Sequence, residues 1–426
     1  MNGQSNFLED SRFQGIKPFQ KRICLSSPTM HGDEQYWIND AIAKNWVSTV
    51  GENINEIECQ IAKKVGRRHA VALSTGTAAL HLAIRLAGER LYGSKPAHVG
   101  SLRGHKVFAS DCTFDATVNP IAYEDGEPVF IDMETDSWNI SPEALERAFE
   151  KYPDVKLIVL AHLYGTPVKC DEIRRIADER GALIVEDAAE SLGAFYKGVP
   201  AGKLGDYSIL SFNGNKIITG SAGGMFLTDN EEDAEKIRKW STQSRENAPW
   251  YQHAELGYNY RMSNIVAGII RGQLPHLEEH VERKKEIYEQ YKRDLKDLPI
   301  TMNPFMDEMQ PNHWLSCMTI REEAMCEQLR TDVSASYRTA PGKSCPTEIL
   351  QALEAFNVEG RPIWKPMHLQ PLYKEYDFVT SKEGSFPNYG EDVFRRGICL
   401  PSDHKMTTEQ QKVVTDVIHR CFYDLN

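Results

Sequence analysis

The sequence contains no run of about 20 apolar residues of the kind that crosses a membrane as a helix. Its first twenty residues, MNGQSNFLEDSRFQGIKPFQ, are polar and mixed in charge. They therefore lack the basic start and apolar core of a secretory signal. These two absences predict a cytoplasmic protein that does not enter a membrane.

Cysteine is sparse and basic residues are outnumbered. The nine cysteines are scattered over 426 residues and include no Cys-x-x-Cys pair, so neither a disulfide framework nor a zinc site is indicated. The 49 Lys and Arg residues face 61 Asp and Glu residues, a net charge of −12. This balance argues against nucleic-acid binding, which needs a basic footprint. A small anionic substrate stays possible, because a few local donors suffice to bind it.

Short apolar strands alternate with amphipathic helices between residues 69 and 228. This alternation predicts an α/β domain with a mostly parallel sheet of seven strands. Ligands bind such sheets at the carboxyl ends of the strands, so polar residues that follow a strand are the candidates for chemistry. The seven predicted strands are 69–74, 106–111, 128–133, 156–163, 182–188, 207–212 and 223–228.

The remainder of the chain predicts two further parts. Residues 1–22 are expected to form an N-terminal arm, residues 23–270 the large domain, and residues 271–426 a smaller α+β domain. The charged stretch LEEHVERKKEIYEQYKRDLKDL, residues 277–298, predicts a long, solvated helix that links the two domains.

Three segments that follow predicted strands carry chemically informative residues. STGTAAL places Ser74 and Gly76 at the start of a helix, whose free N–H groups can bind a phosphate. The segment could equally be an ordinary capped helix. IVEDAAESLGA places Asp187 after a buried strand, where a carboxylate needs a partner such as a protonated pyridine nitrogen. A salt bridge or a helix cap would also satisfy it.

The third segment, SFNGNKIITGSAGGMF, places Lys216 in a loop of small residues that would let a planar cofactor approach the backbone. A lysine that forms a Schiff base must become neutral before it attacks an aldehyde. Taken singly, most lysines are solvated surface residues. The three segments together are more specific, because they follow successive strands of one sheet in the order phosphate site, pyridinium acid, Schiff-base lysine.

In this order the chain resembles the DegT/DnrJ/EryC1/StrS sugar aminotransferases, which have the aspartate-aminotransferase-like fold of type I pyridoxal phosphate enzymes. The resemblance extends from about Ile23 to the C-terminus. Four further segments support it: TFDATVNPI (113–121), HLYGTP (162–167), GYNYRMSNIVAG (257–268) and WKPMHLQPLY (364–373).

The resemblance implies a cofactor, pyridoxal 5′-phosphate, and a role for each matching residue. Lys216 would be the catalytic lysine that forms the Schiff base, and Asp187 would pair with the ring nitrogen. The other implied cofactor contacts are Gly76, Thr77 and Ser211 at the phosphate, Phe114 stacked on the ring, Glu190 near the ring hydroxyl, and Asn259 at the phosphate of a neighbouring subunit's cofactor.

The contact by Asn259 implies a homodimer with shared active sites. His368, Arg245 and Trp364 are the candidates for the sugar-nucleotide pocket. Each has a plainer alternative: a structural histidine for His368, a surface ion pair for Arg245, and core packing for Trp364.

The implied reaction transfers an amino group from L-glutamate to a nucleotide-linked keto sugar for surface glycan or exopolysaccharide synthesis. Two departures from the family pattern, Ser221-Ala222-Gly223-Gly224 for Gly-Glu-Gly-Gly and Glu190 for Gln or His, resemble the branch that aminates UDP-4-keto-6-deoxy-N-acetylhexosamine on the way to bacillosamine. A 3-aminotransferase, a dehydratase and a non-enzymatic regulator stay open as alternatives. Relatives that dehydrate carry histidine at the position of Lys216, which argues against that alternative.

Overall fold

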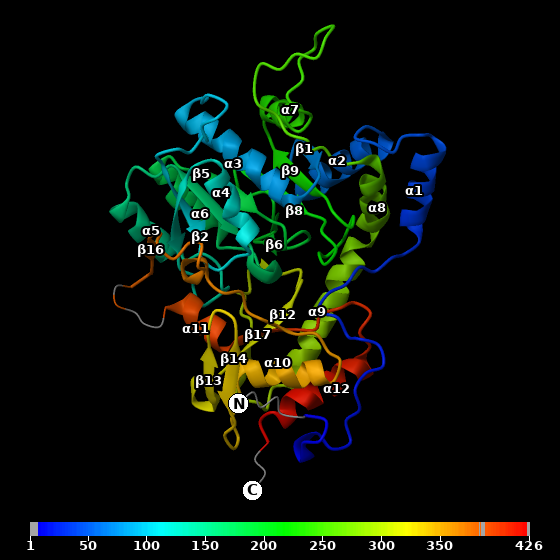
Figure 1. Ribbon diagram of the computed structural model, residues 1–426, viewed down its shortest axis with the longest axis vertical. Helices are drawn as coiled ribbons and strands as arrows, with labels where there is room; N and C mark the ends of the chain where they lie inside the picture. Colours follow the sequence, from blue (N-terminus) through cyan, green and yellow to red (C-terminus); the bar gives the residue numbers. More distant parts are fainter. Residues whose placement is uncertain (1–6, 383, 385–387, 424–426) are drawn as a thin grey trace.

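The computed structural model describes residues 7–382, 384 and 388–423. A large sheet with its helices forms the upper part of Figure 1, and a smaller part lies below it. The strands of the large sheet, in spatial order, are β1 (His69–Leu73), β9 (Gly224–Thr228), β8 (Tyr207–Ser211), β5 (Leu183–Asp187), β4 (Leu157–Ala161), β2 (Lys106–Ser110), β3 (Glu127–Ile131) and β16 (Phe378–Val379).

The large sheet is mostly parallel, as the alternating pattern predicts. The pairs formed by β8, β5, β4, β2, β3 and β16 are all parallel, whereas β9 runs antiparallel to both of its neighbours. The eighth strand corrects the predicted number of seven. β16 has two residues and comes from the C-terminal part of the chain, so no apolar run marked it in the sequence.

Helices cover both faces of this sheet. Because strand side chains alternate in direction, Leu157 and Val159 of β4 pack on one face, and Ile158 and Leu160 pack on the other. One face carries α3 (Gly76–Tyr92), α4 (Asn119–Tyr123) and α7 (Glu231–Trp240). The opposite face carries α2 (Glu52–Val65), α5 (Pro142–Lys151), α6 (Cys170–Arg180) and α8 (Asn264–Gln273), and α1 (Asp33–Ala43) packs on α8.

The smaller part is built on an antiparallel sheet of β10 (Ile300–Met302), β12 (Ser316–Ile320), β17 (Gly397–Leu400) and β15 (Arg361–Pro362). Its core is closed by α9 (Leu277–Asp294), α10 (Pro346–Ala355) and α12 (Thr408–Arg420). The remaining elements are α11 (Tyr389–Arg396), the hairpin β13 (Glu327–Arg330) and β14 (Ala335–Arg338), and a small sheet of β11 (Met309–Gln310), β6 (Phe195–Tyr196) and β7 (Val199–Pro200).

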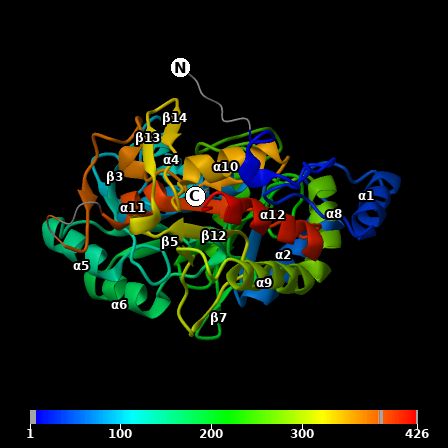
Figure 2. The same cartoon turned by 90° about the horizontal axis from the view of Figure 1, so that it is seen from below.

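The N-terminal segment belongs to this second core. Phe7 and Phe13 are buried there, and Figure 2 shows the blue segment beside α10 and α12. Residues 1–6 of the predicted arm lie outside the described residues. The proposed boundary at residue 270 falls inside α8, and the later segment around β16 returns to the large sheet.

The prediction of a solvated linker helix is wrong for one face of α9. Lys284 and Tyr291 on that face are fully buried, and the Lys284 ammonium donates to the Trp314 carbonyl at 3.0 Å. Burial lowers the pKa of Lys284 to about 7. The charged sequence contains no sign of this buried face, because it does not show that a distant backbone carbonyl accepts from the lysine. Within the ranges described above, no helix has the length and apolarity needed to cross a membrane.

Candidate active site

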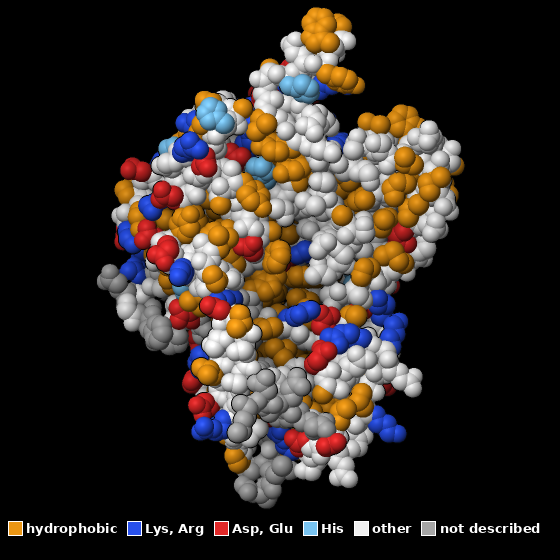
Figure 3. All heavy atoms as spheres, in the orientation of Figure 1, with side chains coloured by type: hydrophobic (Ala, Val, Ile, Leu, Met, Phe, Trp, Pro, Cys, Tyr) orange, Lys and Arg blue, Asp and Glu red, His pale blue; other side chains and the backbone are white. Residues whose placement is uncertain are grey.

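A cavity of about 320 Å³ opens at the carboxyl ends of β4, β5 and β8. The start of α3 forms one wall, and Trp314 and Trp364 from the C-terminal part close the opposite side. Figure 3 shows a hollow lined by hydrophobic side chains between the two parts of the molecule. The cavity therefore lies where the sheet topology places ligands, and both parts of the chain contribute to it.

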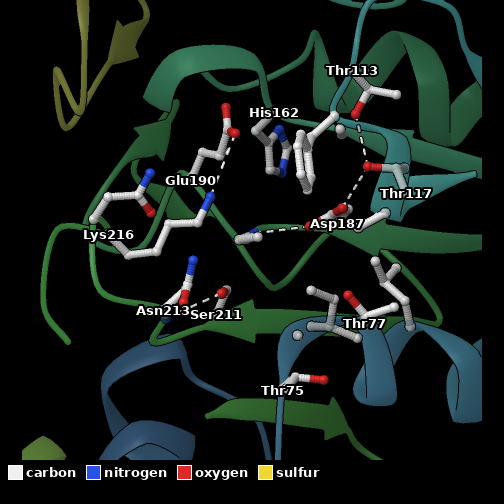
Figure 4. Close-up of a pocket in the computed structure, with 18 of the residues that line it drawn as sticks. Thr75, Thr77, Thr113, Thr117, His162, Asp187, Glu190, Ser211, Asn213 and Lys216 are labelled. Carbon is white, nitrogen blue, oxygen red and sulfur yellow. Dashed lines mark hydrogen bonds and ion pairs between the residues drawn. The ribbon is translucent and has the colours of Figure 1, made fainter. Parts of the chain in front are cut away.

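The start of α3 and the end of β8 form one polar end of the cavity. Thr75 caps the helix, and its hydroxyl accepts from the Ala78 N–H at 3.0 Å. A Cβ atom at Gly76 would lie 3.0 Å from the Ser211 Cβ, so glycine lets the serine sit against the first turn of the helix. Figure 4 shows Thr75, Thr77 and Ser211 on the same side of the cavity. Helix N–H groups and hydroxyls at this point suit a phosphate.

The loop after Lys216 reaches this helix through two glycines. A Cβ at Gly224 would come within 2.3 Å of the Thr75 carbonyl oxygen, and Gly223 has a φ of +117°. Both positions thus require glycine for the loop to pass beside the N-terminus of α3. These contacts explain the two glycines in the segment Ser221-Ala222-Gly223-Gly224, whose first two residues differ from the family pattern Gly-Glu-Gly-Gly.

Asp187 is the buried carboxylate of the site. Thr117, in the short 3-10 helix η2 (Asp115–Thr117), donates its hydroxyl to Asp187 Oδ2 at 2.7 Å, and the Ala189 N–H donates to Oδ1 at 3.0 Å. Thr113 in turn donates to Thr117 at 2.7 Å, as Figure 4 shows. Burial raises the pKa of Asp187 despite these donors. A cation next to this carboxylate, such as a protonated ring nitrogen, would offset the cost of burying it.

Lys216 and Glu190 face each other across the cavity. The Lys216 Nζ lies 3.5 Å from Glu190 Oε1 and 4.2 Å from the centre of the Trp314 ring. Glu190 Oε2 accepts from the Tyr164 N–H at 2.8 Å. Burial raises the pKa of Glu190 to about 7. Glu190 can therefore hold or release a proton near neutral pH beside the lysine amine.

His162 is a cavity residue to which the sequence analysis assigned no role. Its Nδ1 accepts from the Val168 N–H at 3.0 Å, so the ring proton is on Nε2, which donates to Glu186 Oε1 at 2.7 Å. Burial alone would raise the pKa of Glu186, but donors that include His162 and Ser208 lower it to about 2. The signal for His162 was its place directly after β4, at the sheet edge where Asp187 ends β5.

The structure brings most of the predicted site residues together. Eight of them line the cavity: Gly76, Thr77, Phe114, Asp187, Glu190, Ser211, Lys216 and Trp364. Phe114 is 57% exposed, and its ring centre lies 5.4 Å from that of Trp364. Thr117 and Trp314, like His162, line the cavity but were not predicted from the sequence. No local sequence pattern pointed to Trp314, because it reaches the cavity from the smaller part, where it lies just before β12.

His368, Arg245 and Asn259 do not line the cavity of their own chain. Both ring nitrogens of His368 have carboxylate partners: its Nδ1 lies 2.7 Å from Asp111 Oδ2, and its Nε2 lies 3.0 Å from Glu391 Oε1. Arg245 and Asn259 are exposed in the segment between α7 and α8, part of which protrudes at the top of Figure 1.

Comparison with known proteins decides the family. Residues 28–419 match the model of the DegT/DnrJ/EryC1/StrS aminotransferase family. The chain belongs to this family. The predicted family and α/β fold class are thereby confirmed, and the protein is a sugar aminotransferase whose cofactor is pyridoxal 5′-phosphate.

Individual relatives agree with this family over nearly the whole chain. EpsN of Bacillus subtilis (strain 168), assigned as a pyridoxal phosphate-dependent aminotransferase, is 41% identical over 408 residues, which are 95% of this chain and 96% of EpsN. The GDP-perosamine synthase of Escherichia coli O157:H7 is 30% identical over 404 residues, 95% of this chain and 100% of the synthase. The structure of DesI with its TDP-sugar product superposes with a TM-score of 0.80 at 25% identity and covers 96% of this chain and 95% of DesI.

The residues of the cavity fit the cofactor. The polar end at Gly76 and Ser211 suits its phosphate, and Asp187 offers a buried carboxylate for its ring nitrogen. Lys216, which also lines the cavity, would supply the amine for its aldehyde. The aromatic side chains Phe114 and Trp364 also line the cavity.

Proposed function

We propose that the protein transfers the amino group of L-glutamate to the C4 ketone of a UDP-linked 4-keto-6-deoxy-N-acetylhexosamine for the synthesis of a surface polysaccharide. The observation that carries this proposal is the meeting of Lys216, Asp187 and Glu190 in one cavity that is lined with aromatic rings at its opening. Its support from relatives is coarser: the relatives act on nucleotide sugars with different bases, GDP in perosamine synthase and TDP in DesI.

The chain's own residues have distinct tasks in this reaction. When bound, the cofactor supplies an electron sink for the bond that breaks at the amino donor. Asp187 would stabilise the positive charge of the ring nitrogen, because Thr117 and the Ala189 N–H fix both of its oxygens. The Lys216 Nζ would take the proton from the donor's α-carbon as a base and deliver it, as an acid, to the cofactor carbon that carried the aldehyde.

Glu190 supports this proton transfer from the side. Its carboxyl lies 3.5 Å from the lysine amine and is fixed by the Tyr164 N–H. With a pKa raised by burial to about 7, it can hold a proton near the amine while Lys216 moves its own. Trp314 and Trp364 would exclude water from the reacting carbon and orient the sugar ring.

The first test is a visible absorbance spectrum of the protein loaded with pyridoxal phosphate, beside that of a Lys216→Ala variant. We expect a yellow band from the lysine-bound cofactor in the wild type that is lost when glutamate is added. The variant should show no glutamate-dependent loss. A wild-type protein that binds the cofactor but does not respond to glutamate would contradict the choice of glutamate as the amino donor.

Amination assays with UDP-, GDP- and dTDP-linked 4-keto-6-deoxy sugars then test the substrate. We expect the highest kcat/KM for the UDP sugar. A preference for the GDP sugar would overturn the proposed nucleotide and leave the aminotransferase activity in place. The position of the new amine on the product distinguishes 4-amination from 3-amination.

We also propose that the active enzyme is a homodimer with shared sites. Side chains on and after α1 form an exposed apolar surface, part of which is visible in Figure 3: Tyr36, Ile42, Trp46, Val47 and Val50. A second copy would cover this surface and bring its own Asn259 toward the cavity, which explains why Asn259 is outside the cavity of its own chain.

Mixed variants test the shared site. Lys216→Ala and Asn259→Ala proteins are each expected to be impaired. Because a hybrid dimer carries both changes in one site and neither in the other, a mixture that exchanges subunits should recover roughly a quarter of the wild-type sites. No recovery in a mixture whose subunit exchange is verified would contradict sharing through Asn259.

A further inference from the structure

Four histidines from three distant segments gather at the start of α9, away from the cavity. His31 precedes α1, His276 ends the 3-10 helix η4 (Leu274–His276), His280 lies in the first turn of α9, and His404 follows β17. The rings of His31 and His276 stack with centres 3.6 Å apart, and those of His280 and His404 are 4.2 Å apart. Figure 1 shows the blue N-terminal segment passing the start of α9.

The spacing across the end of η4 and the first turn of α9 is that of a chelating helix. The sequence HLEEH, residues 276–280, places His276, Glu279 and His280 at positions i, i+3 and i+4, which share one face of a helical turn. Two histidines four residues apart on a helix are a recurrent pair of ligands for zinc. One ligand atom each from His31, His276 and Glu279 lie within 4.8 Å of one another. His31 Nε2 also lies 2.7 Å from His280 Nε2.

The second nitrogen of each helix histidine is already engaged. His280 Nδ1 donates to the Ile217 carbonyl at 2.7 Å, so the lone pair of its Nε2 faces His31. His276 Nε2 lies 3.2 Å from Asp33 Oδ2, and its Nδ1 lies 3.4 Å from Glu279 Oε2. A neutral ring can donate to only one of these carboxylates. An acceptor behind the ring is the usual way in which a metal-binding histidine is oriented.

His404 provides an independent observation at the same place. Its Nε2 is buried, and the structure as described shows no hydrogen-bond partner for it. The ring packs on His280 and, with His31 and Glu279, lines a pocket of about 450 Å³. A buried imidazole nitrogen without a hydrogen-bond partner is energetically costly. The cluster is therefore suited to a metal ion, which accepts nitrogen lone pairs.

We propose that His31, His276, His280 and Glu279 bind one divalent transition-metal ion of the class that prefers imidazole, such as Zn²⁺, Co²⁺ or Ni²⁺. Three nitrogens and one carboxylate oxygen make a closed, four-coordinate site of the structural type. The nitrogens of His31 and His280 must separate to roughly 3.3 Å to share a tetrahedral ion, and the stacked rings of His31 and His276 must tilt so that their in-plane lone pairs converge on it.

The proposed ion acts as a brace behind the active site. His280 holds the carbonyl of Ile217, and Ile217 directly follows Lys216. Binding at this point ties the segment before α1 and the start of α9 to the loop that carries the lysine. The ion itself lies outside the cavity and takes no part in the amine transfer, so this inference does not depend on the proposed substrate.

Calorimetric titration with Zn²⁺ tests the site in chelator-treated protein without a histidine tag. We expect one equivalent to bind the wild type, and a cobalt complex with visible ligand-field bands. His31→Asn and Glu279→Gln should each weaken binding at least about tenfold. His98→Asn is the matched control, because His98 is exposed in the loop before β2.

Two further measurements separate metal loss from misfolding. The side chain of Glu279 is 69% exposed, so Glu279→Gln should fold normally, and both variants should keep the far-UV circular dichroism of the wild type. Zn²⁺ should raise the Tm of the wild type and of His98→Asn more than that of His31→Asn. No stoichiometric binding to the wild type, or equal affinity in all four proteins, would overturn the proposal.

Discussion

The raised pKa of Glu190 makes a quantitative prediction for the cofactor-free protein. Burial raises this pKa from its ordinary value of 4.5 to about 7. Below pH 4.5 the group is protonated in both the folded and the unfolded chain. Between pH 4.5 and 7 the unfolded chain loses the proton while the folded chain keeps it, so the free energy of unfolding falls as the pH rises.

Glu190→Gln removes this dependence because glutamine does not titrate. A shift of about 2.5 pH units corresponds to about 3 kcal/mol at 1.36 kcal/mol per unit. Relative to the wild type, the variant should therefore gain about 3 kcal/mol in the free energy of unfolding as the pH rises from 4.5 to 8. For a chain of this length that equals about 3–4 °C in Tm.

The assay is denaturant unfolding, or a thermal scan at fixed rate, of cofactor-free protein at several pH values. Glu323→Gln is the matched control, because it makes the same substitution at an exposed glutamate outside the cavity. A difference for Glu190→Gln that stays constant from pH 4.5 to pH 8, or that grows in favour of the wild type, would refute the reasoning.

Two other substitutions test the ends of the cavity. Thr117→Val removes the hydroxyl that donates to Asp187 at 2.7 Å, so we expect a loss of about 1–3 kcal/mol in stability and a further rise in the pKa of Asp187. Denaturant unfolding and the pH dependence of cofactor binding measure the two effects; unchanged values for both would show that the hydrogen bond is not formed. Gly76→Ala places a Cβ 3.0 Å from that of Ser211, so cofactor affinity should fall about tenfold in an absorbance titration. Gly214→Ala is its control, because a Cβ at Gly214 has open space around it, and an equal loss in both variants would contradict the proposed crowding.

The sequence alone determined the features that depend on local pattern. Strands of the large sheet are apolar runs bounded by polar residues, and their order along the chain predicts parallel pairing. The three segments around Gly76, Asp187 and Lys216 each follow a strand, so their meeting at one sheet edge follows from the topology. Resemblance to the family added Phe114 and Trp364, which no pattern would have selected.

Only the tertiary structure decided the features that depend on contacts between distant segments. Trp314 reaches the cavity from the smaller part, and His162 gains its role from Glu186 on the neighbouring strand. The contacts of His368 could not be read from the sequence either, because its partners, Asp111 and Glu391, lie 257 and 23 residues away.

The same reason explains the buried face of α9. Its charged sequence indicates a solvated helix, but Lys284 is held by a carbonyl 30 residues further along the chain, and the helix side chains His276 and His280 meet His31 from the N-terminal segment. A polar side chain can be buried when a partner satisfies it, and the sequence does not show which distant group will be that partner. The pattern of one segment therefore predicts its local structure, whereas its burial and its chemistry are set by what packs against it.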